Sequence, residues 1–343
     1  MSLLRRDLYL PQKARCIIRM TVRPYALMRE DDSLMKRWTF DTIPDQSGRT
    51  AIVTGANTGI GFETARMLAA KGARVIIACR NLAKGETALS RIRSTHSGVN
   101  IDLALLDLGD LASVAAFAEG IHKTHTRLDL LINNAGVMIP PFTRTKQQFE
   151  LQFGTNHLGH FALSGRLFPL LERTTGSRLV TVSSTAAYTG RIDFDDLDYR
   201  RRPYRAWAAY SQSKLANLLF MLELGRRLSA SSASVMATAA HPGWTATELQ
   251  RNTLPARLLN PLFAMKPADG ALPTLRAAVD PSARNGAYFG PGGPLELSGP
   301  PARARLPGRA LDSGVAQKLW IQSEELTGVA FPLPASPALR QAG

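Results

Sequence analysis

Tyr210 and Lys214 stand four residues apart in the run YSQSK. On a helix this spacing places both side chains on one face. A tyrosine hydroxyl has a reference pKa of about 10, so on its own it transfers protons poorly near neutral pH. A neighbouring ammonium favours the phenolate and lowers that pKa. The pair therefore indicates a general acid and base, with a simple contact on a helix surface as the alternative.

Two other segments carry polar residues suited to the same chemistry. Ser183 and Ser184 end a predicted strand in VSS, where a serine can also act as a helix cap. Asn156 stands in GTNHLG, inside a predicted long helix, although asparagine is unfavourable in helix interiors. We therefore expect a kink at Asn156 or a water bound by its backbone carbonyl.

The run TGANTGIG, residues 54–61, follows the first predicted strand and opens the first predicted helix. Its glycines, Gly55, Gly59 and Gly61, would let the backbone approach a pyrophosphate, and the helix start offers unpaired amides and a positive dipole. Their spacing departs from the G-x-G-x-x-G of the common dinucleotide fingerprint. A tight turn that needs glycine for its backbone and binds nothing is the alternative.

The ends of the following strands carry groups that could hold the rest of a dinucleotide. In ACRN, Arg80 occupies the position where an acidic residue would bind the ribose 2′-hydroxyl of NAD. We expect Arg80 to pair with the 2′-phosphate of NADP(H), with a solvated surface arginine as the alternative. Asp107 follows the third predicted strand, and NNAG follows the fourth. Taken alone, Asp107 would indicate a helix cap and NNAG would indicate a turn. Together these segments predict one cofactor, NADP(H).

Short runs rich in Val, Ile and Leu alternate with helical segments from residue 49 onward, which is typical of a parallel sheet buried on both faces. We predict an α/β fold, a single Rossmann-type domain with a doubly wound parallel sheet over residues 38–330. The predicted strands are residues 50–54, 74–78, 100–106, 128–133, 178–183 and 234–239, and the helices are residues 60–70, 84–94, 111–125, 147–173 and 208–228.

The sequence becomes rich in proline and glycine after residue 240, and we predict a small substrate-covering segment there, at about residues 244–285. The remaining predicted elements are helices at residues 257–262, 267–279 and 314–326 and a strand at residues 287–290. Residues 1–37 are Arg-rich and predict a loosely ordered extension, and residues 331–343 predict a frayed tail.

The composition, with 45% hydrophobic and 20% charged residues among 343, predicts a globular chain with a sizeable core. The net charge of +15 suggests a polyanionic partner, but the basic residues are spread along the chain and their one run, residues 200–202, lacks interleaved aromatics. Cys16 and Cys79 supply neither a disulfide framework nor a metal site. No apolar stretch approaches the ~20 residues that span a bilayer. We expect a cytoplasmic protein with no nucleic-acid partner, metal or integral membrane segment.

In combination the motifs resemble the short-chain dehydrogenases/reductases of the NADP-preferring type, in particular the retinol dehydrogenase-like and WW-domain-oxidoreductase-like branch. TGANTGIG, ACRN, NNAG, the Asn156 segment, VSS, YSQSK and HPGWTAT occur in the expected order, and the resemblance covers about residues 38–325. The long segment RIDFDDLDYRRRPYRAW also looks like that branch. The resemblance implies hydride transfer between NADP(H) and a carbonyl or alcohol.

The resemblance also implies roles for particular residues. Tyr210 would be the general acid in carbonyl reduction and the base in alcohol oxidation, and Lys214 would lower its pKa and hold the nicotinamide ribose. Ser184 would orient the substrate oxygen, with Ser183 as the alternative, and Asn156 would anchor a water in the proton relay. The implied cofactor contacts are Gly55, Asn57, Thr58, Gly59, Ile60, Gly61, Arg80, Asn81, Asp107, Leu108, Asn134, Ala135, Gly136, Tyr210, Lys214, Pro242, Gly243 and Thr247.

An apolar pocket suited to a small lipophilic aldehyde, ketone or alcohol would be lined by Val137, Met138, Tyr188 and Trp244. Two other functions stay open. One is a protochlorophyllide-reductase-like reduction of a double bond by NADPH, which also uses a Tyr and Lys pair. The other is a non-catalytic NADP-binding scaffold, because fold does not fix function. A homodimer through the helices at residues 147–173 and 208–228 is a further expectation.

Overall fold

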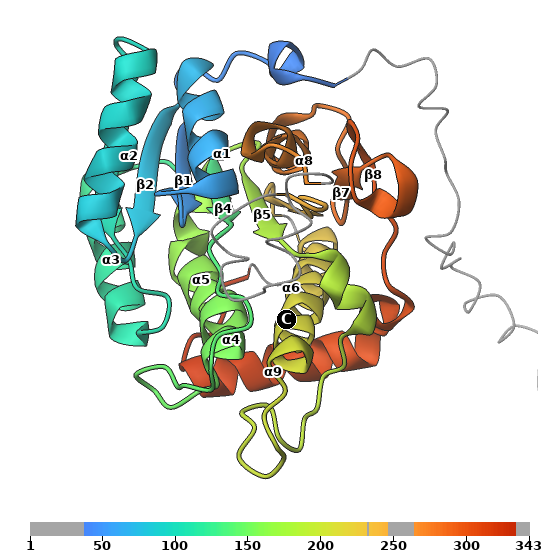
Figure 1. The fold of residues 1–343 in the computed structure, drawn as a ribbon. Helices are drawn as coiled ribbons and strands as arrows, with labels where there is room; N and C mark the ends of the chain where they lie inside the picture. Colours follow the sequence, from blue (N-terminus) through green and yellow to red (C-terminus); the bar gives the residue numbers. More distant parts are fainter. Residues whose placement is uncertain (1–37, 232, 246–263, 334–343) are drawn as a thin grey trace, which may run out of the picture. The chain divides into compact units, whose positions relative to one another are not determined.

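A sheet with strand order β3-β2-β1-β4-β5-β6-β7-β8 forms the centre of the computed structural model, which describes residues 38–231, 233–245 and 264–333 (Figure 1). The strands are β1 (Thr50–Thr54), β2 (Arg74–Cys79), β3 (Ile101–Leu105), β4 (Leu130–Asn133), β5 (Arg178–Val182), β6 (Met236–Ala240), β7 (Tyr288–Pro291) and β8 (Pro301–Arg303). Neighbouring strands are parallel except β7 and β8, which are antiparallel. The predicted strands correspond to β1 to β7. The sequence predicts no strand at β8, because a three-residue run between prolines carries no alternation.

Helices cover both faces of the sheet (Figure 1). They are α1 (Gly59–Ala70), α2 (Leu82–Thr95), α3 (Leu111–Thr124), α4 (Leu151–Phe153), α5 (Gly159–Glu172), α6 (Ala206–Ser229), α8 (Pro267–Val279) and α9 (Ser313–Thr327). Short single-turn elements are η2 (Phe40–Thr42), η3 (Gly154–Leu158), η4 (Thr185–Thr189), η6 (Pro294–Glu296) and η7 (Gly308–Leu311).

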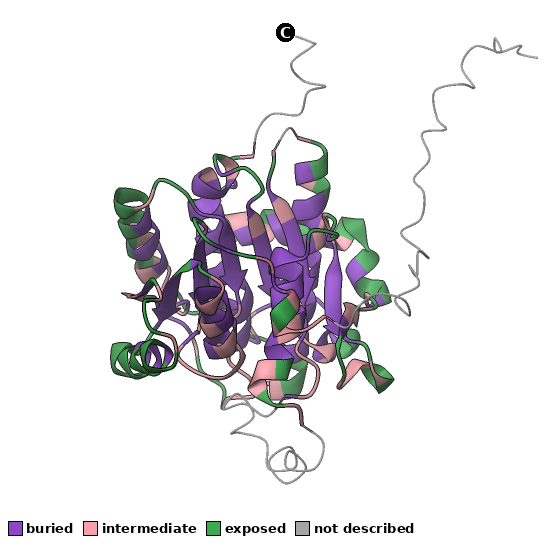
Figure 2. Ribbon diagram, turned by 90° about the horizontal axis from the view of Figure 1, so that it is seen from above, coloured by how far each residue is buried: buried purple, intermediate pink, exposed green. Residues whose placement is uncertain are grey.

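Alternate residues of each strand pack against opposite helix layers. Val53, Ile77 and Ile132 belong to the cluster formed with α1, α2 and α8. Ile52 and Leu131, their neighbours in the chain, belong to the cluster with α3, α5, α6 and α9. Figure 2 shows the sheet buried between helices whose outer faces are exposed. Each fully buried aliphatic side chain of this kind contributes roughly 1.5–3 kcal/mol, so the apolar strands specify a sheet covered on both faces.

The strand order reverses between β1 and β4, which are adjacent although β2 and β3 separate them in the chain. In open parallel sheets the ligand crevice lies at such a reversal, outside the carboxyl ends of the strands. The turns after β1, β4, β5 and β6 therefore meet at one edge. The predicted fold class is confirmed.

The predicted helix at residues 147–173 begins later and is interrupted. Arg144 and Glu150 form an antiparallel bridge, and Gln148 between them has φ +67°, so the chain turns tightly there. The Glu150 carboxylate then caps α4 by accepting from Gln152 N and Phe153 N. A π-helical turn, η3, follows before α5 begins.

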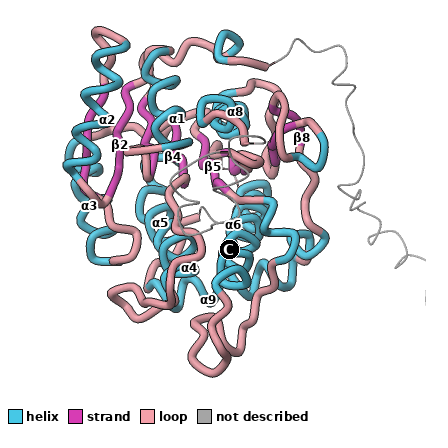
Figure 3. The backbone as a smooth tube through the Cα atoms, viewed as in Figure 1, coloured by secondary structure: helices cyan, strands magenta, loops and turns pink. Residues whose placement is uncertain are grey.

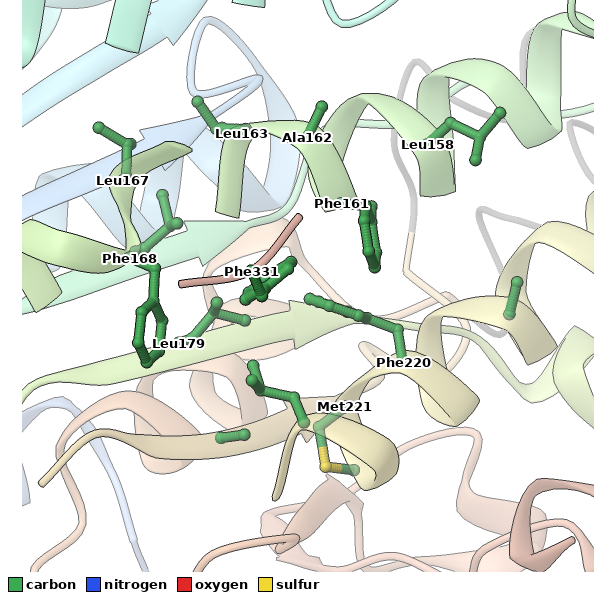
Figure 4. Packing of buried hydrophobic residues seen from close by; sticks show 14 of the residues in the cluster. Leu158, Phe161, Ala162, Leu163, Leu167, Phe168, Leu179, Phe220, Met221 and Phe331 are labelled. Carbon is green, nitrogen blue, oxygen red and sulfur yellow. The ribbon is translucent and has the colours of Figure 1, made fainter. Parts of the chain in front are cut away.

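The C-terminal helix α9 covers α5 and α6. Trp320 of α9 packs against Phe161 and Phe220, and Phe331 lies 4.6 Å from Trp320 between ring centroids. Figure 4 shows Phe331 among Phe161, Phe168 and Phe220. The packed part of the chain thus extends past the boundary predicted at residue 330, and residues 334–343 of the predicted tail lie outside the described residues. Helix α9 thus packs on both helices suggested for a dimer, α5 and α6.

A long loop connects η4 to α6 without helix or strand (Figure 3). It is the branch-specific segment of the sequence. The Arg202–Asp193 ion pair at 2.9 Å links two parts of this loop, and a Gln212 Nε2 bond to Leu197 O holds the loop against α6. Residues 1–37, the predicted helix at 257–262 and much of the predicted substrate cover lie outside the described residues. Among the residues that are described, no helix is long and apolar enough to cross a membrane.

Candidate active site

The glycine turn after β1 packs directly on the turn after β4. Gly55 has φ +67°, and a Cβ added there would lie 2.9 Å from Ala135 Cα. A Cβ on Gly61 would overlap the side-chain amide of Asn134. Thr58, which precedes α1, makes no side-chain cap, and the first turn of α1 holds no acidic residue. The amides at this helix start are therefore free of side-chain acceptors from the cap, and a phosphate is the ligand that such a helix start favours.

Thr54 holds the NNAG turn in position through three hydrogen bonds. Its hydroxyl oxygen accepts from Asn134 N and Ala135 N, both at 2.9 Å, and its carbonyl accepts from Asn134 Nδ2 at 2.8 Å. The same hydroxyl lies 2.9 Å from His160 Nε2. A threonine at the end of β1 thus sets the position of the turn after β4.

Asn156 lies in the π-helical turn η3 and is fully buried. Its Oδ1 accepts from Val137 N at 2.8 Å, and its Nδ2 donates to Val137 O and to Ser213 Oγ, both at 3.0 Å. The side chain therefore ties the loop segment that follows NNAG to helix α6. At Asn156, where a kink or a bound water was expected, the structure has a π-helical turn, and π-turns of this kind recur at functional sites.

The backbone carbonyl of Asn156 lies 3.0 Å from His160 Nδ1. A carbonyl only accepts, so Nδ1 carries the proton and Nε2 accepts from the Thr54 hydroxyl. Burial lowers the pKa of His160 to about 4 and keeps the ring neutral, which this arrangement requires. His160 was not predicted from its sequence motif, although its position one helical turn after Asn156 was a usable signal.

Tyr210 and Ser184 meet beside Lys214. Tyr210 is 4% exposed on α6, and its hydroxyl forms a hydrogen bond with the Ser184 side chain, which also accepts from Ala186 N at the start of η4. Lys214 Nζ donates to Val182 O at 3.2 Å and lies 5.8 Å from the Tyr210 ring centroid. Ser183 Oγ instead donates to Lys214 O at 2.8 Å. Of the two serines, Ser184 is the one that contacts the tyrosine.

Burial changes the acidity of both members of the Tyr210–Lys214 pair. It raises the pKa of Tyr210 to about 12, against the lowering effect of the Ser184 hydrogen bond, and it lowers the pKa of Lys214 to about 8. From the sequence, Lys214 was expected to lower the pKa of Tyr210. In the structure the loss of solvent outweighs any such effect, so the phenol is protonated at neutral pH.

The ends of β2 and β3 lie beside the glycine turn, since Gly55 N donates to Ala78 O at 2.7 Å. Arg80 follows β2 and is exposed. Asn81 uses its side chain to cap α2, accepting from Lys84 N, so that side-chain oxygen already has a partner within the fold. Asp107 accepts from Gly109 N and shapes the turn after β3, whereas Asp110 caps α3.

Other predicted contacts also lie at this edge. Three residues after β6 are half-buried: Pro242, Gly243 and Trp244. The same holds for residues of the glycine turn and of the segment that begins with NNAG, namely Asn57, Thr58, Gly59, Ile60, Gly136 and Met138. Leu108 is buried against Gly159, and Tyr188 is 44% exposed in η4. Thr247 lies outside the described residues.

Gln152 is a further residue that sequence reasoning missed. It is fully buried, its Oε1 accepts from Ile139 N, and its Nε2 donates to Ala206 O at 2.8 Å and to Tyr204 Oη. It thereby fixes the segment after NNAG against the start of α6, which carries Tyr210. Its partners lie far away in sequence, so no local motif indicates this role.

The family model for short chain dehydrogenases matches residues 49–257, from the start of β1 past the turn after β6. The chain belongs to the short-chain dehydrogenase family. Human retinol dehydrogenase 13 is 42% identical over 302 residues, which cover 85% of this chain and 87% of the human protein. Mouse retinol dehydrogenase 12 is 42% identical over 288 residues, covering 82% and 87%. The chain thus falls in the retinol dehydrogenase-like branch.

Solved structures of short-chain dehydrogenases share the fold. An uncharacterised protein of Mycobacterium paratuberculosis superposes with a TM-score of 0.75 at 43% identity, covering 87% of this chain and all of that one. A short-chain dehydrogenase of Escherichia coli CFT073, solved in complex with NADPH, gives 0.58 at 26% identity, covering 71% and 96%. As a member of this family the protein is an oxidoreductase that transfers a hydride and uses a nicotinamide cofactor.

Proposed function

We propose that this short-chain dehydrogenase reduces a lipophilic carbonyl compound with NADPH, or oxidises the corresponding alcohol with NADP⁺, and that Tyr210 is its general acid and base. The observation that carries the proposal is the buried Tyr210 side chain, whose hydroxyl is hydrogen-bonded with Ser184 and whose ring centroid lies 5.8 Å from Lys214 Nζ. When bound, the nicotinamide supplies or takes up the hydride. The protein supplies position, proton and charge.

The hydroxyl of Tyr210 carries its proton at neutral pH, because burial raises its pKa to about 12. This rise weakens the acid, so the transfer of its proton to a substrate oxygen that gains negative charge depends on stabilisation of the phenolate. Ser184 can donate a second hydrogen bond to the same oxygen. Lys214, with a pKa of about 8, is mostly cationic at neutral pH and stabilises the phenolate that remains.

Arg80 supports NADP(H) as the cofactor. It stands at the end of β2, beside the glycine turn, and is exposed, so its guanidinium is free to pair with a 2′-phosphate. The NADPH complex of the E. coli relative is consistent with this choice. We expect Arg80→Asp to move the preference from NADPH toward NADH, because a carboxylate repels the phosphate and accepts from a 2′-hydroxyl. Arg173→Asp, on the exposed end of α5 at the opposite edge, is the matched control, and a wild type that already prefers NADH would refute this assignment.

The segment around Val137, Met138, Tyr188 and Trp244 supports a lipophilic substrate, since its side chains are mostly apolar and lie at the same edge as Tyr210. The curated relatives are retinol dehydrogenases. We therefore propose a retinoid-like or other lipophilic aldehyde, ketone or alcohol as the substrate class.

Tyr210→Phe tests the mechanism, because it removes one hydroxyl and leaves the ring. We expect turnover to fall by at least about 100-fold, the usual contribution of a positioned general acid, while the dissociation constant for NADPH stays within about twofold. Tyr199→Phe, a buried tyrosine of the η4–α6 loop, is the matched control. Turnover of Tyr210→Phe equal to that of the wild type would refute the assigned acid.

A further inference from the structure

The turn after β6 is hydrogen-bonded to the connection between β7 and β8. Trp244 N donates to Leu297 O at 2.8 Å, and Gly243, with φ +63°, leaves no room for a Cβ against that same carbonyl. His241 Nε2 lies 3.0 Å from Glu296 Oε2. The backbone that precedes the proposed nicotinamide contacts is therefore fixed by residues more than fifty positions later in the chain.

The hydrogen bonds of His241 assign a distinct role to each of its ring nitrogens. Gly243 N donates to Nδ1 at 3.3 Å, so Nδ1 has no proton, and Nε2 carries the proton that it donates to Glu296. The ring is fully buried and packs against Tyr288 at 5.3 Å between centroids. A Cβ on Gly290 would overlap the ring, so this strand position must be glycine to admit it. The imidazole thus joins the amide of Gly243 to the carboxylate of Glu296.

Glu296 reaches this position through an unusual backbone. Leu295 and Glu296 have φ values of +53° and +56°, a region that residues other than glycine rarely adopt, and the Leu295 side chain is 83% exposed. Packing of Leu295 does not account for the conformation. The Glu296 carboxylate does make two specific contacts, with His241 through Oε2 and with Arg305 N through Oε1 at 2.9 Å. Strained residues of this kind persist where a function requires them.

The second contact extends to the substrate side of the site. Tyr188 Oη donates to Arg305 O at 2.8 Å, and Tyr188 stands four residues after Ser184. One chain of contacts thus crosses the edge of the sheet, through Tyr188, Arg305, Glu296, His241 and Gly243.

We infer that Glu296 and His241 form a positioning pair that sets the Pro242–Gly243 backbone for the nicotinamide end of the cofactor, and that Arg305 links this pair to Tyr188 on the substrate side. The inference rests on the proposed function and adds two positioning residues to it. Neither residue transfers a proton to the substrate. Their effect is to hold a backbone turn that the cofactor must contact.

Steady-state kinetics with NADPH and a carbonyl substrate test this pair through Glu296→Ala and Glu296→Gln. We expect Glu296→Ala to raise KM for NADPH about tenfold, which is the size of losing a hydrogen bond to a charged group, with a smaller effect on kcat. Glu296→Gln keeps the volume of the side chain but has one acceptor oxygen for two donors, His241 Nε2 and Arg305 N. It should therefore also raise KM for NADPH, but by less than Glu296→Ala does. Glu119→Gln, an exposed carboxylate of α3 paired with Lys123, is the control for loss of one charge.

Amide hydrogen exchange provides a readout that does not depend on turnover. In either Glu296 variant the Gly243 amide should exchange faster than in the wild type, while amides of the central strand β1 stay protected. If Glu296→Ala does not fold, KM for NADPH and Gly243 exchange measured in Glu296→Gln test the inference. An unchanged KM for NADPH and unchanged Gly243 exchange in the folded variants would overturn the inference. A wild-type protein that binds no nicotinamide nucleotide would instead overturn the proposed function.

Discussion

Replacing Lys214 with methionine should make the protein more stable while it removes activity. Lys214 is 3% exposed, and burial lowers its pKa from 10.5 to about 8. This difference corresponds to roughly 3 kcal/mol by which burial disfavours the charged form in the folded protein. Methionine has a similar length and no charge, so Lys214→Met should raise the free energy of unfolding by about 2 kcal/mol at pH 7, once the lost bond to Val182 O is allowed for.

The pH dependence of this effect has a definite sign. Between pH 8 and pH 10.5 the unfolded chain binds a proton at Lys214 that the folded protein has released, so stability rises with pH through this window. The cost of burying the ammonium is fully present below pH 8 and vanishes above pH 10.5. The advantage of Lys214→Met over the wild type should therefore shrink across the same window.

Thermal unfolding without cofactor measures both effects. For a domain of this size about 2 kcal/mol shifts Tm by roughly 5 °C. Lys123→Met, which removes an exposed lysine of α3, should change Tm by less than about 1 °C because surface substitutions of this kind are nearly neutral. A Lys214→Met protein less stable than the wild type at pH 7, or an advantage that does not decline above pH 8, would refute the reasoning about the buried charge.

Three other predictions follow from the same structure. The kcat/KM for carbonyl reduction should fall as pH rises through about 8, because Lys214 loses the charge that stabilises the phenolate, and a flat pH–rate profile to pH 10 would contradict this. Leu295→Gly should stabilise the protein by about 1 kcal/mol in urea unfolding, because glycine adopts its positive φ without strain; a loss of stability would contradict the assignment of strain. Phe331→Ala should cost about 3 kcal/mol in the same assay, and a cost below about 1 kcal/mol would show that α9 and its aromatic cluster are not part of the core.

The fold could be predicted from the sequence because its strands are buried on both faces. Continuous apolar runs such as Ala51, Ile52 and Val53 stand out from the helices between them, and the glycine turn marks the first crossing from strand to helix. Strand β8 could not be predicted, because it is short and pairs with β7 only after the chain has folded back. Asn156 indicated an irregularity in the predicted helix, but the π-turn itself could not be predicted, because the Asn156 side chain belongs to a tertiary contact and not to a helix surface.

The site could be predicted only as far as its local motifs reached. Tyr210 and Lys214 are neighbours on one helix, so their spacing in the sequence was enough to predict that their side chains lie together. The contacts of Thr54 with His160 and of His241 with Glu296 join residues that are distant in sequence, and no spacing reveals them. The direction of the Tyr210 pKa shift also required the fold, because it depends on how completely helix α6 and its neighbours exclude water from the hydroxyl.

The central claim is hydride transfer from NADPH to a lipophilic carbonyl at a site that depends on Tyr210. The most direct measurement uses NADPH that carries deuterium at both C4 positions of its nicotinamide ring. The acceptors are all-trans-retinaldehyde and a panel of lipophilic aldehydes and ketones, and the products are analysed by mass spectrometry. We expect an alcohol with deuterium on its carbinol carbon from the wild type, formed at least about 100-fold more slowly by Tyr210→Phe. Deuterium transfer by Tyr210→Phe at the wild-type rate, or no transfer to any carbonyl by a wild type that binds NADPH, would contradict it.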